Sequence, residues 1–338
     1  MACAGGIAHA APGSKELALR PGVGVQFHCT WGQTDAKRNA IASKLAAAGL
    51  KSVRIDIAWP SLQPSRAHRV SGWYAAVADR CVNLARSKGM EVLGTLLWTP
   101  GWANRGRDGG TPPSRAADFA WIAHWAARHF RGRVAAWEIW NEPNVSRFWK
   151  GSPRRYVRLL RAAYPAIKAG DRNAKVVFGG VTHNDDRWLA AAYAAGAHGA
   201  FDVMATHPYQ GVGDAAPETA DAGGDWWLFT HAPAVHDLMA RHGDGAKPIW
   251  FTEFGWSVHP NGPGLALWQR GVTPEEQAAY LSRAITLARL RYPYVEKAFW
   301  YKDAARPGED EIEAGYGLLR DDLSPRPAYA ALKALLLG

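Results

Sequence analysis

Short apolar runs rich in β-branched and aromatic residues alternate along the chain with longer stretches whose apolar residues recur at helical spacing. The short runs predict buried strands and the longer stretches predict helices, eight of each. The predicted strands are 22–28, 52–59, 91–99, the run that starts at Val134, 175–182, 201–209, 249–253 and 297–303. The predicted helices are 35–48, 73–87, 116–130, 153–169, 187–195, 231–242, 274–291 and 327–337.

Strict alternation of eight strands with eight helices is typical of the (β/α)8 TIM barrel, an α/β fold in which parallel strands close into a cylinder inside a ring of helices. A chain of 338 residues fits one such domain. We expect the barrel to occupy residues 21–338, with residues 1–20 as a tail. Three long loops that follow strands, 100–115, 210–230 and 257–272, are expected to shape a cleft.

The N-terminal residues are small, and the segment Ala8–Pro12 resembles the cleavage region of a secretory signal. We therefore expect a secreted or periplasmic protein, with a plain disordered tail as the alternative. The three cysteines, Cys3, Cys29 and Cys81, form no disulfide framework and show no metal-ligand spacing, so they leave the compartment open. No stretch of about 18 consecutive apolar residues predicts a membrane span.

The chain is basic, with a formal net charge of +10. Such a charge admits an anionic polysaccharide or a nucleic acid as partner. However, the basic residues are scattered among alanine-rich helices, which favours compositional bias over a binding surface. We expect no nucleic-acid partner and a monomeric protein.

Two carboxylates occupy equivalent places at the ends of predicted strands. The run that starts at Val134 breaks at Asn141-Glu142-Pro143, because proline cannot continue a central strand. The strand 249–253 ends in Glu253 and a glycine-containing loop. Glu138 lies earlier on the same face as Glu142, and we interpret it as an interior carboxylate held by an arginine or by hydrogen bonds.

Two facing carboxylates inside aromatic walls match the needs of glycoside hydrolysis, where one acts as an acid and the other as a nucleophile or base. The sequence contains no phosphate-binding glycine loop, no HExxH motif and no nucleophile elbow, so we expect no cofactor and no metal. Many of the 17 tryptophans fall at strand ends or in the loops that follow strands, and aromatic faces suit sugar rings. We therefore expect the long loops to form a carbohydrate cleft.

The string WEIWNEPN, which contains Glu142, and the later string FTEFGW, which contains Glu253, resemble the clan A retaining glycoside hydrolases. The chain looks most like glycoside hydrolase family 39 and its bacterial exopolysaccharide-hydrolase relatives, although families 5 and 53 share these elements. The resemblance implies Glu142 as acid/base and Glu253 as nucleophile. Family 39 members often carry an accessory β-sandwich, whereas this chain ends soon after the eighth helix and is expected to be a bare barrel.

The resemblance also implies a set of substrate-binding and positioning residues. Asn141 would bond the sugar 2-OH, and Arg54 would keep the nucleophile ionised. His207 and Tyr209 would orient the nucleophile, and Trp300 would form the floor under the sugar, followed by a cis peptide bond to Tyr301. Two further expected substrate contacts are Trp98 and His28.

The expected reaction is hydrolysis of a poly- or oligosaccharide, either neutral or anionic, by double displacement with retention. Endo action on an exopolysaccharide is favoured. Two alternatives stay open: an exo-acting glycosidase such as a β-xylosidase, and a non-catalytic carbohydrate-binding barrel.

Overall fold

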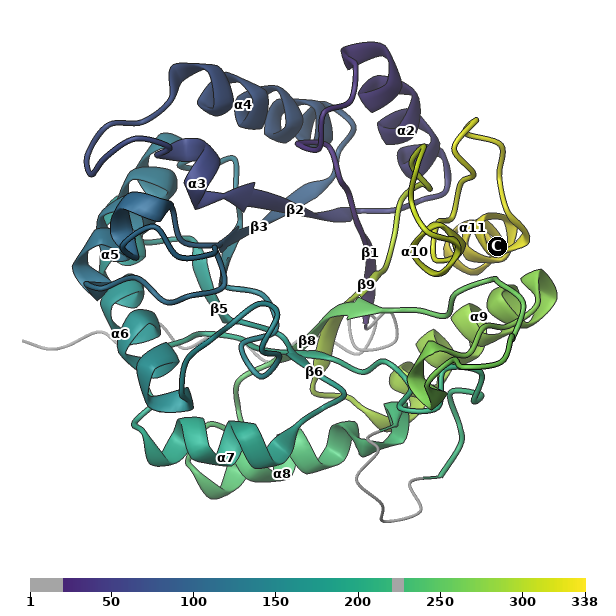
Figure 1. Ribbon diagram of the computed structural model, residues 1–338. Coiled ribbons are helices and arrows are strands. Elements are labelled where there is room, and N and C mark those ends of the chain that lie inside the picture. The colour runs from purple at the N-terminus through teal and green to yellow at the C-terminus, as the bar shows by residue number, and fades with distance from the viewer. Residues whose placement is uncertain (1–20, 221–227) are drawn as a thin grey trace, which may run out of the picture.

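The computed structural model describes residues 21–220 and 228–338 (Figure 1). The expected tail and signal remnant in residues 1–20 and part of the loop 210–230 therefore lie outside the described residues. Helices form an outer ring around a cylinder of strands, as the alternating pattern predicts (Figure 1). The strands are β1 (Gly22–Gln26), β2 (Ser52–Ala58), β3 (Glu91–Leu97), β4 (Ala136–Ile139), β5 (Lys175–Phe178), β6 (Val181–Thr182), β7 (Met204–His207), β8 (Ile249–Phe254) and β9 (Val295–Trp300).

In the described part of the chain, the outer ring consists mainly of eight long helices whose apolar sides pack against the strands. Short helical turns fill several loops. The long helices are α2 (Asp35–Ala47), α4 (Gly72–Ser87), α5 (Ala116–His129), α6 (Pro153–Gly170), α7 (Asp186–Ala194), α8 (Ala232–Arg241), α9 (Pro274–Arg291) and α11 (Pro327–Leu337). The short ones are α3 (Trp59–Leu62), α10 (Glu311–Gly315), η1 (Gly101–Ala103), η2 (Phe229–His231) and η3 (Leu267–Gln269).

All strand pairs are parallel and follow the order β5-β4-β3-β2-β1-β9-β8-β7-β6. The two ends of this order, β5 and β6, are pieces of the single strand predicted at 175–182. The Phe178 N–H donates to the Val203 carbonyl at 2.9 Å, and Val177 bridges Val203, so the sheet closes on itself. The predicted TIM barrel is confirmed, with its fifth strand divided in two.

The division falls at Gly179 and Gly180, and packing explains it. A Cβ atom at Gly180 would lie 2.2 Å from Nε2 of His207 and 2.7 Å from Oγ1 of Thr252. Only glycine lets the backbone pass this close to those side chains. The break in the strand therefore makes room for groups at the end of the barrel.

The apolar core has two layers. One small cluster fills the barrel interior, with Trp250 and Phe299 as its largest members. A larger cluster lies between the strands and the helices and includes Trp137, Trp140 and Trp300. Since successive residues of a strand face opposite sides, strands such as β4, β7 and β8 contribute to both layers.

Cys29, just after β1, is bonded to Cys81 on α4, with the Cα atoms 5.7 Å apart. The expectation that the cysteines form no disulfide framework is corrected for this pair. The two residues are 52 positions apart, and the pairing of β1 with β2, the strand that precedes α4, brings the end of β1 beside α4. No helix in the described part of the chain has the length and apolar character needed to cross a membrane.

We predict that the double variant Cys29→Ala/Cys81→Ala lowers the free energy of unfolding by about 2–4 kcal/mol, since the bond no longer restricts the unfolded chain. Urea denaturation followed by tryptophan fluorescence measures this difference. A reductant in the denaturation buffer should destabilise the wild type and leave the double variant unchanged. Equal sensitivity of both proteins would contradict the prediction.

Candidate active site

Six of the nine predicted site residues converge at the carboxyl-terminal ends of the strands. They come from β2, the loop after β4, β7 and its loop, and β8. They are Arg54, Asn141, Glu142, His207, Tyr209 and Glu253. In TIM barrels this end carries the chemistry.

Arg54 is the hub of the group. Its side chain is 1% exposed, and Nε donates to Oε2 of Glu138 at 2.6 Å. Nη1 donates to Gln26 at 2.8 Å and to Oε1 of Glu253 at 2.6 Å, and Nη2 donates to Oδ1 of Asn141 at 2.8 Å. Burial lowers the pKa of Arg54, but the adjacent carboxylates outweigh it and raise the pKa, so the guanidinium stays charged.

The structure confirms the interpretation of Glu138 as an interior carboxylate, since its side chain is fully buried. Its Oε2 accepts from Arg54 and from Thr95 Oγ1 at 2.8 Å. Its Oε1 accepts from Thr252 Oγ1 at 2.7 Å and from the Gly180 N–H at 3.2 Å. The two oxygens of this buried carboxylate thus accept four hydrogen bonds, one of them from a charged donor, which is the stronger kind.

Glu253 has two donors on separate oxygens. Arg54 bonds Oε1, and the Tyr209 hydroxyl donates to Oε2 at 3.0 Å. The two bonds fix the plane of the carboxylate. Burial and the charge of Glu253 hold the pKa of Tyr209 well above its ordinary value, so this hydroxyl keeps its proton and remains a donor.

A chain of hydrogen bonds fixes where His207 carries its protons. Thr252 donates its hydroxyl hydrogen to Glu138, so its oxygen is left to accept from His207 Nε2 at 3.0 Å. Nε2 therefore bears a hydrogen. Nδ1 lies 2.9 Å from Oε1 of Glu142, and a hydrogen bond there needs one further proton, either on His207 or on Glu142. The Glu142–His207 pair holds one proton between its two partners.

The pKa shifts agree with a shared proton. Burial lowers the pKa of His207, but the charges of Glu253 and Glu142 outweigh it and raise the pKa. Burial raises the pKa of Glu142, yet the hydrogen bond and charge of His207 bring it below its ordinary value. Burial raises the pKa of Glu253, and Glu142 adds to the rise while His207 and Arg54 oppose it.

The two carboxylates are close. One oxygen of Glu142, one oxygen of Glu253 and a ring nitrogen of His207 all lie within 4.8 Å of one another. Among the described residues this is the one trio spaced to hold a metal ion. Arg54 already occupies one side of Glu253 at 2.6 Å, and the pair Glu142–His207 holds a proton, so the trio suits acid–base chemistry better than a cation.

Backbone strain positions Glu142. Trp140 has φ +75° and Glu142 has φ +41°, in the left-handed region that non-glycine residues rarely adopt. Such residues cost about 1–3 kcal/mol each and persist where the surroundings hold them. The Trp140 indole N–H donates to the Phe148 carbonyl at 2.9 Å, and the Glu142 N–H donates to the Gly180 carbonyl at 3.1 Å. These bonds turn the Glu142 side chain over the barrel mouth.

Trp300 does not reach the group, so its expected position under a sugar is corrected. Its side chain is fully buried in the layer between barrel and helices, where it packs against Phe254 and Trp256. Tyr301 takes the inward position, with its ring 6.4 Å from that of Tyr209. The non-proline cis bond joins Tyr301 to Lys302, one residue later than expected. A strand alternates its faces, so one position of register exchanges Trp300 for Tyr301.

The remaining two predicted residues, His28 and Trp98, lie beside the group at the carboxyl-terminal end of the barrel. His28 is 2% exposed, its Nδ1 bonds Asp303 at 3.0 Å, and its ring edge meets Trp31 and Tyr301. Trp98 is partly exposed at the end of β3, where its ring packs against Phe148. Neither side chain contacts Glu142 or Glu253 in the described hydrogen bonds and ring contacts.

Three residues at this end of the barrel, Thr252, Tyr301 and Asp56, were not among the predicted site residues. Thr252 sets the tautomer of His207, the charge of Glu253 contributes to the raised pKa of Tyr301, and the charge of Asp56 contributes to the raised pKa of Glu253. Period-two alternation could have found two of them, since Asp56 shares a face with Arg54 and Tyr301 shares one with Phe299.

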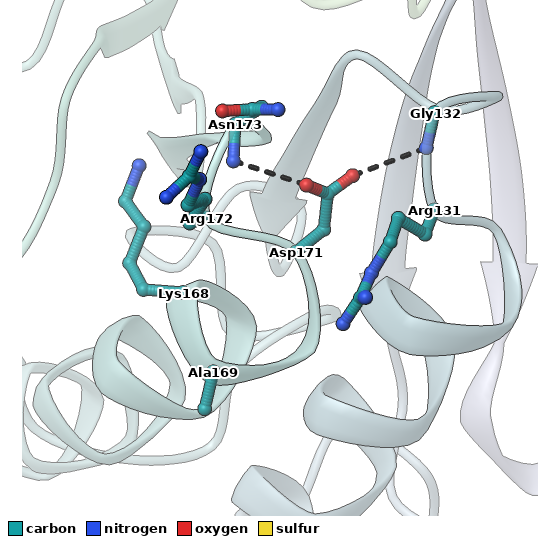
Figure 2. A pocket seen from close by; sticks show the side chains of 7 residues that line it. All are labelled: Arg131, Gly132, Lys168, Ala169, Asp171, Arg172 and Asn173. Carbon is teal, nitrogen blue, oxygen red and sulfur yellow. Dashed lines mark hydrogen bonds between the residues drawn. The ribbon is translucent and has the colours of Figure 1, made fainter.

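A separate hollow of about 450 Å³ lies at the opposite end of the barrel, between the ends of α5 and α6 (Figure 2). Asp171 accepts from the backbone N–H groups of Gly132 at 3.1 Å and Asn173 at 3.0 Å (Figure 2). The Arg131 Nε donates to the Gly170 carbonyl at 2.8 Å, and Lys168 pairs with Asp202 at 2.6 Å. These polar groups are used to tie loops together, so we interpret the hollow as structural.

We predict that Arg54→Lys lowers the free energy of unfolding by about 3 kcal/mol or more, because one ammonium cannot serve acceptors on four sides and leaves buried carboxylates unpaired. Chemical denaturation measures it. The matched control is Arg283→Lys, whose pair with Glu218 is half exposed, at 49% and 42%, and should change stability by less than about 1 kcal/mol. Similar losses in both variants would contradict the assigned role of Arg54.

Comparison with known proteins agrees with this geometry. The family model described as Cellulase (glycosyl hydrolase family 5) matches residues 18–283. A β-xylosidase from Caldicellulosiruptor saccharolyticus is 25% identical over 241 residues, which cover 67% of this chain and 47% of that protein. The chain thus spans about half the length of this relative.

Solved structures share the fold. A family 39 glycoside hydrolase from Bacteroides cellulosilyticus WH2 has a TM-score of 0.75 and 23% identity, covering 95% of this chain and 64% of that one. An exo-β-1,4-mannosidase from Opitutaceae bacterium strain TAV5 has a TM-score of 0.65 and 17% identity, covering 93% and 59%. The expected resemblance to clan A is confirmed, and family 39 enzymes are among the similar structures. The chain belongs to glycosyl hydrolase family 5.

Proposed function

We propose that this protein is a retaining glycosidase in which Glu253 is the nucleophile and Glu142 the acid/base. The observation that carries the proposal is a pair of carboxylates, Glu142 and Glu253, that have oxygens within 4.8 Å of each other. The two carboxylates also have different hydrogen-bond partners. Retaining enzymes place their carboxyl groups about 5–5.5 Å apart, and inverting enzymes about 6.5–9.5 Å apart. Arg54 and Tyr209 favour an ionised Glu253, while Glu142 shares a proton with His207.

The reaction proceeds in two displacements. A Glu253 oxygen attacks the anomeric carbon, the bond to the leaving oxygen breaks, and that oxygen takes the proton of the Glu142–His207 pair. Water then gives a proton back to Glu142 as it attacks the anomeric carbon and releases Glu253. His207 stores the proton at 2.9 Å from Glu142, and the amide of Asn141, held by Arg54 through Oδ1, presents its N–H groups to the sugar 2-OH.

The substrate we propose is a poly- or oligosaccharide, with endo action on an exopolysaccharide as the first arrangement to test. Trp31 and Trp268, on loops after β1 and β8, are about half exposed, at 51% and 48%, and offer stacking faces beyond the catalytic carboxylates. The alternative is exo action, and the names β-xylosidase and exo-mannosidase among the relatives favour it. Product size separates the two, since only an endo-enzyme releases oligosaccharides early.

A carbohydrate-binding barrel without activity is a weaker alternative. Binding alone needs neither a proton held beside Glu142 nor a second carboxylate within 4.8 Å of it. Export from the cytosol remains our proposal for location, and the buried Cys29–Cys81 bond supports it, because disulfides persist mainly in oxidising compartments.

We predict different effects of the two carboxylate variants. Glu253→Gln removes the nucleophile and should reduce kcat at least about 10⁴-fold on every substrate, with the fold intact by circular dichroism. Glu142→Gln should slow oligosaccharides comparably but spare the first step for aryl glycosides with acidic leaving groups, which need no protonation. A pre-steady-state burst of the aryl alcohol would then appear, because the second step still lacks its base.

Equal losses in both variants on all leaving groups would contradict these roles. Proton NMR of the first-formed sugar anomer adds an independent test, since inversion would exclude Glu253 as a covalent nucleophile.

The pH dependence of kcat/KM should be bell-shaped. Falling pH protonates Glu253, whose pKa is raised above 4.5, so the acid limb lies above 4.5. Rising pH removes the proton of the Glu142–His207 pair, and the pKa of His207 is raised above 6.5, so the alkaline limb lies above 6.5. In His207→Asn the acid limb should move to higher pH, because the charge that lowers the pKa of Glu253 is gone. An acid limb that stays in place would refute the coupling.

A further inference from the structure

Asp56 occupies the inward face of β2, two residues after Arg54 and one layer nearer the barrel mouth. Its side chain is 15% exposed and lies 3.9 Å from Nη1 of Arg54. That Nη1 already donates to Gln26 at 2.8 Å and to Glu253 at 2.6 Å. The described residues give the Asp56 carboxylate no hydrogen bond of its own, so both of its oxygens are free to accept.

The backbone around Asp56 is held firmly. The Thr30 hydroxyl donates to the Asp56 carbonyl at 2.9 Å, and the Tyr74 hydroxyl contacts the Ala58 N–H at 3.1 Å. These contacts hold the backbone from which the Asp56 side chain extends. The Asp56 carboxylate lies on the same side of Arg54 as Glu253, because both carboxylates approach the same Nη1 atom, and its charge contributes to the raised pKa values of Glu253 and Tyr301.

We infer that Asp56 binds neighbouring hydroxyls of the sugar attached to Glu253 and restricts this subsite to neutral sugars. The inference rests on the proposed glycosidase function and names its substrate class. Two adjacent carboxylate oxygens match two adjacent hydroxyl donors, and bonds to an ionised acceptor are the stronger kind.

The charges near the subsite exclude a uronic acid there. Four carboxylates, Asp56, Glu138, Glu142 and Glu253, face Arg54 and His207. Both cations are already committed to carboxylates at 2.6–2.9 Å.

Two further cations follow β9, and each pairs with a carboxylate. Lys302 is fully buried, bonds Glu309 at 2.6 Å and lies 3.9 Å from Glu313, and the Arg306 Nε bonds the same Glu309 oxygen at 2.6 Å. Arg306 Nη1 has no hydrogen-bond partner among the described residues, but its guanidinium lies over the Trp31 ring. A carboxylate on a sugar beside Asp56 would thus meet four carboxylates whose cations are already paired, which is costly in a site shielded from water.

The test compares kcat/KM for matched pairs of aryl glycosides that differ only in a neutral or a carboxylate group at C6. Wild type should prefer the neutral member by at least about 100-fold. In Asp56→Asn, kcat/KM for the neutral member should fall about 10- to 100-fold, because the variant loses a charged acceptor. The ratio of kcat/KM for the neutral member to that for the carboxylate member should fall about tenfold or more, because the variant also loses a repelling charge. Asp237→Asn, whose side chain is 68% exposed on α8, is the control and should change neither number.

Deoxy glycosides, which lack one hydroxyl, add a measurement that distinguishes sugar binding by Asp56 from a structural role of this residue. Removal of the hydroxyl that Asp56 binds should slow wild type strongly and slow Asp56→Asn little further. Thermal unfolding of Asp56→Asn checks that the fold is kept.

Faster hydrolysis of the uronide by wild type, or an unchanged preference in Asp56→Asn, would overturn the inference while leaving the glycosidase function intact. A preference for an amino sugar would also overturn it, since the carboxylate would then be pairing a cation. Failure of wild type to cleave any glycoside would remove the proposed function itself, and the inference with it.

Discussion

The buried ion pair between Arg54 and Glu138 is the centre of the hydrogen-bond network that holds Asn141 and Glu253 and that reaches Glu142 through Thr252 and His207. A guanidinium taken out of water is costly unless its donors all find acceptors, and here three strands, β1, β4 with its end, and β8, supply the four acceptors. Glu138 in turn accepts from β3, β5–β6 and β8. One pair thus ties together strands that are distant in sequence, and it fixes Glu253 and Asn141 as part of the same network.

The network also determines, through His207, that Glu142 has a partner with which it shares a proton. Glu138 takes the Thr252 hydroxyl hydrogen, Thr252 accepts from Nε2 of His207, and Nδ1 is then left with a bond to Glu142 that requires a proton. Two glutamates in similar surroundings acquire different partners in this way. Glu253 receives a fixed cation, and Glu142 receives a group that can give up or take a proton, so the asymmetry comes from the second layer of side chains.

The period-two and helical patterns predicted the barrel and brought most of the site together, because strand ends in a closed parallel sheet must meet at one rim. Helices α9 and α11 begin and end where the pattern placed them. The patterns could not assign faces at β9, where a shift of one residue exchanges Trp300 for Tyr301. They also could not predict the Cys29–Cys81 bond, which depends on how α4 packs beside the end of β1, nor the shared partners of Arg54, which depend on side-chain reach from several strands.

The whole chain carries a positive net charge, whereas the side chains at the barrel mouth include four carboxylates. The net charge of +10 resides largely on exposed side chains, whose fields are screened over about 8–10 Å by salt. The carboxylates at the barrel mouth lie in a shielded environment, where electrostatic interactions are stronger at the same distance. The surface charge and the carboxylates at the barrel mouth therefore act under different screening, so the net charge of the chain does not predict which sugar is cleaved.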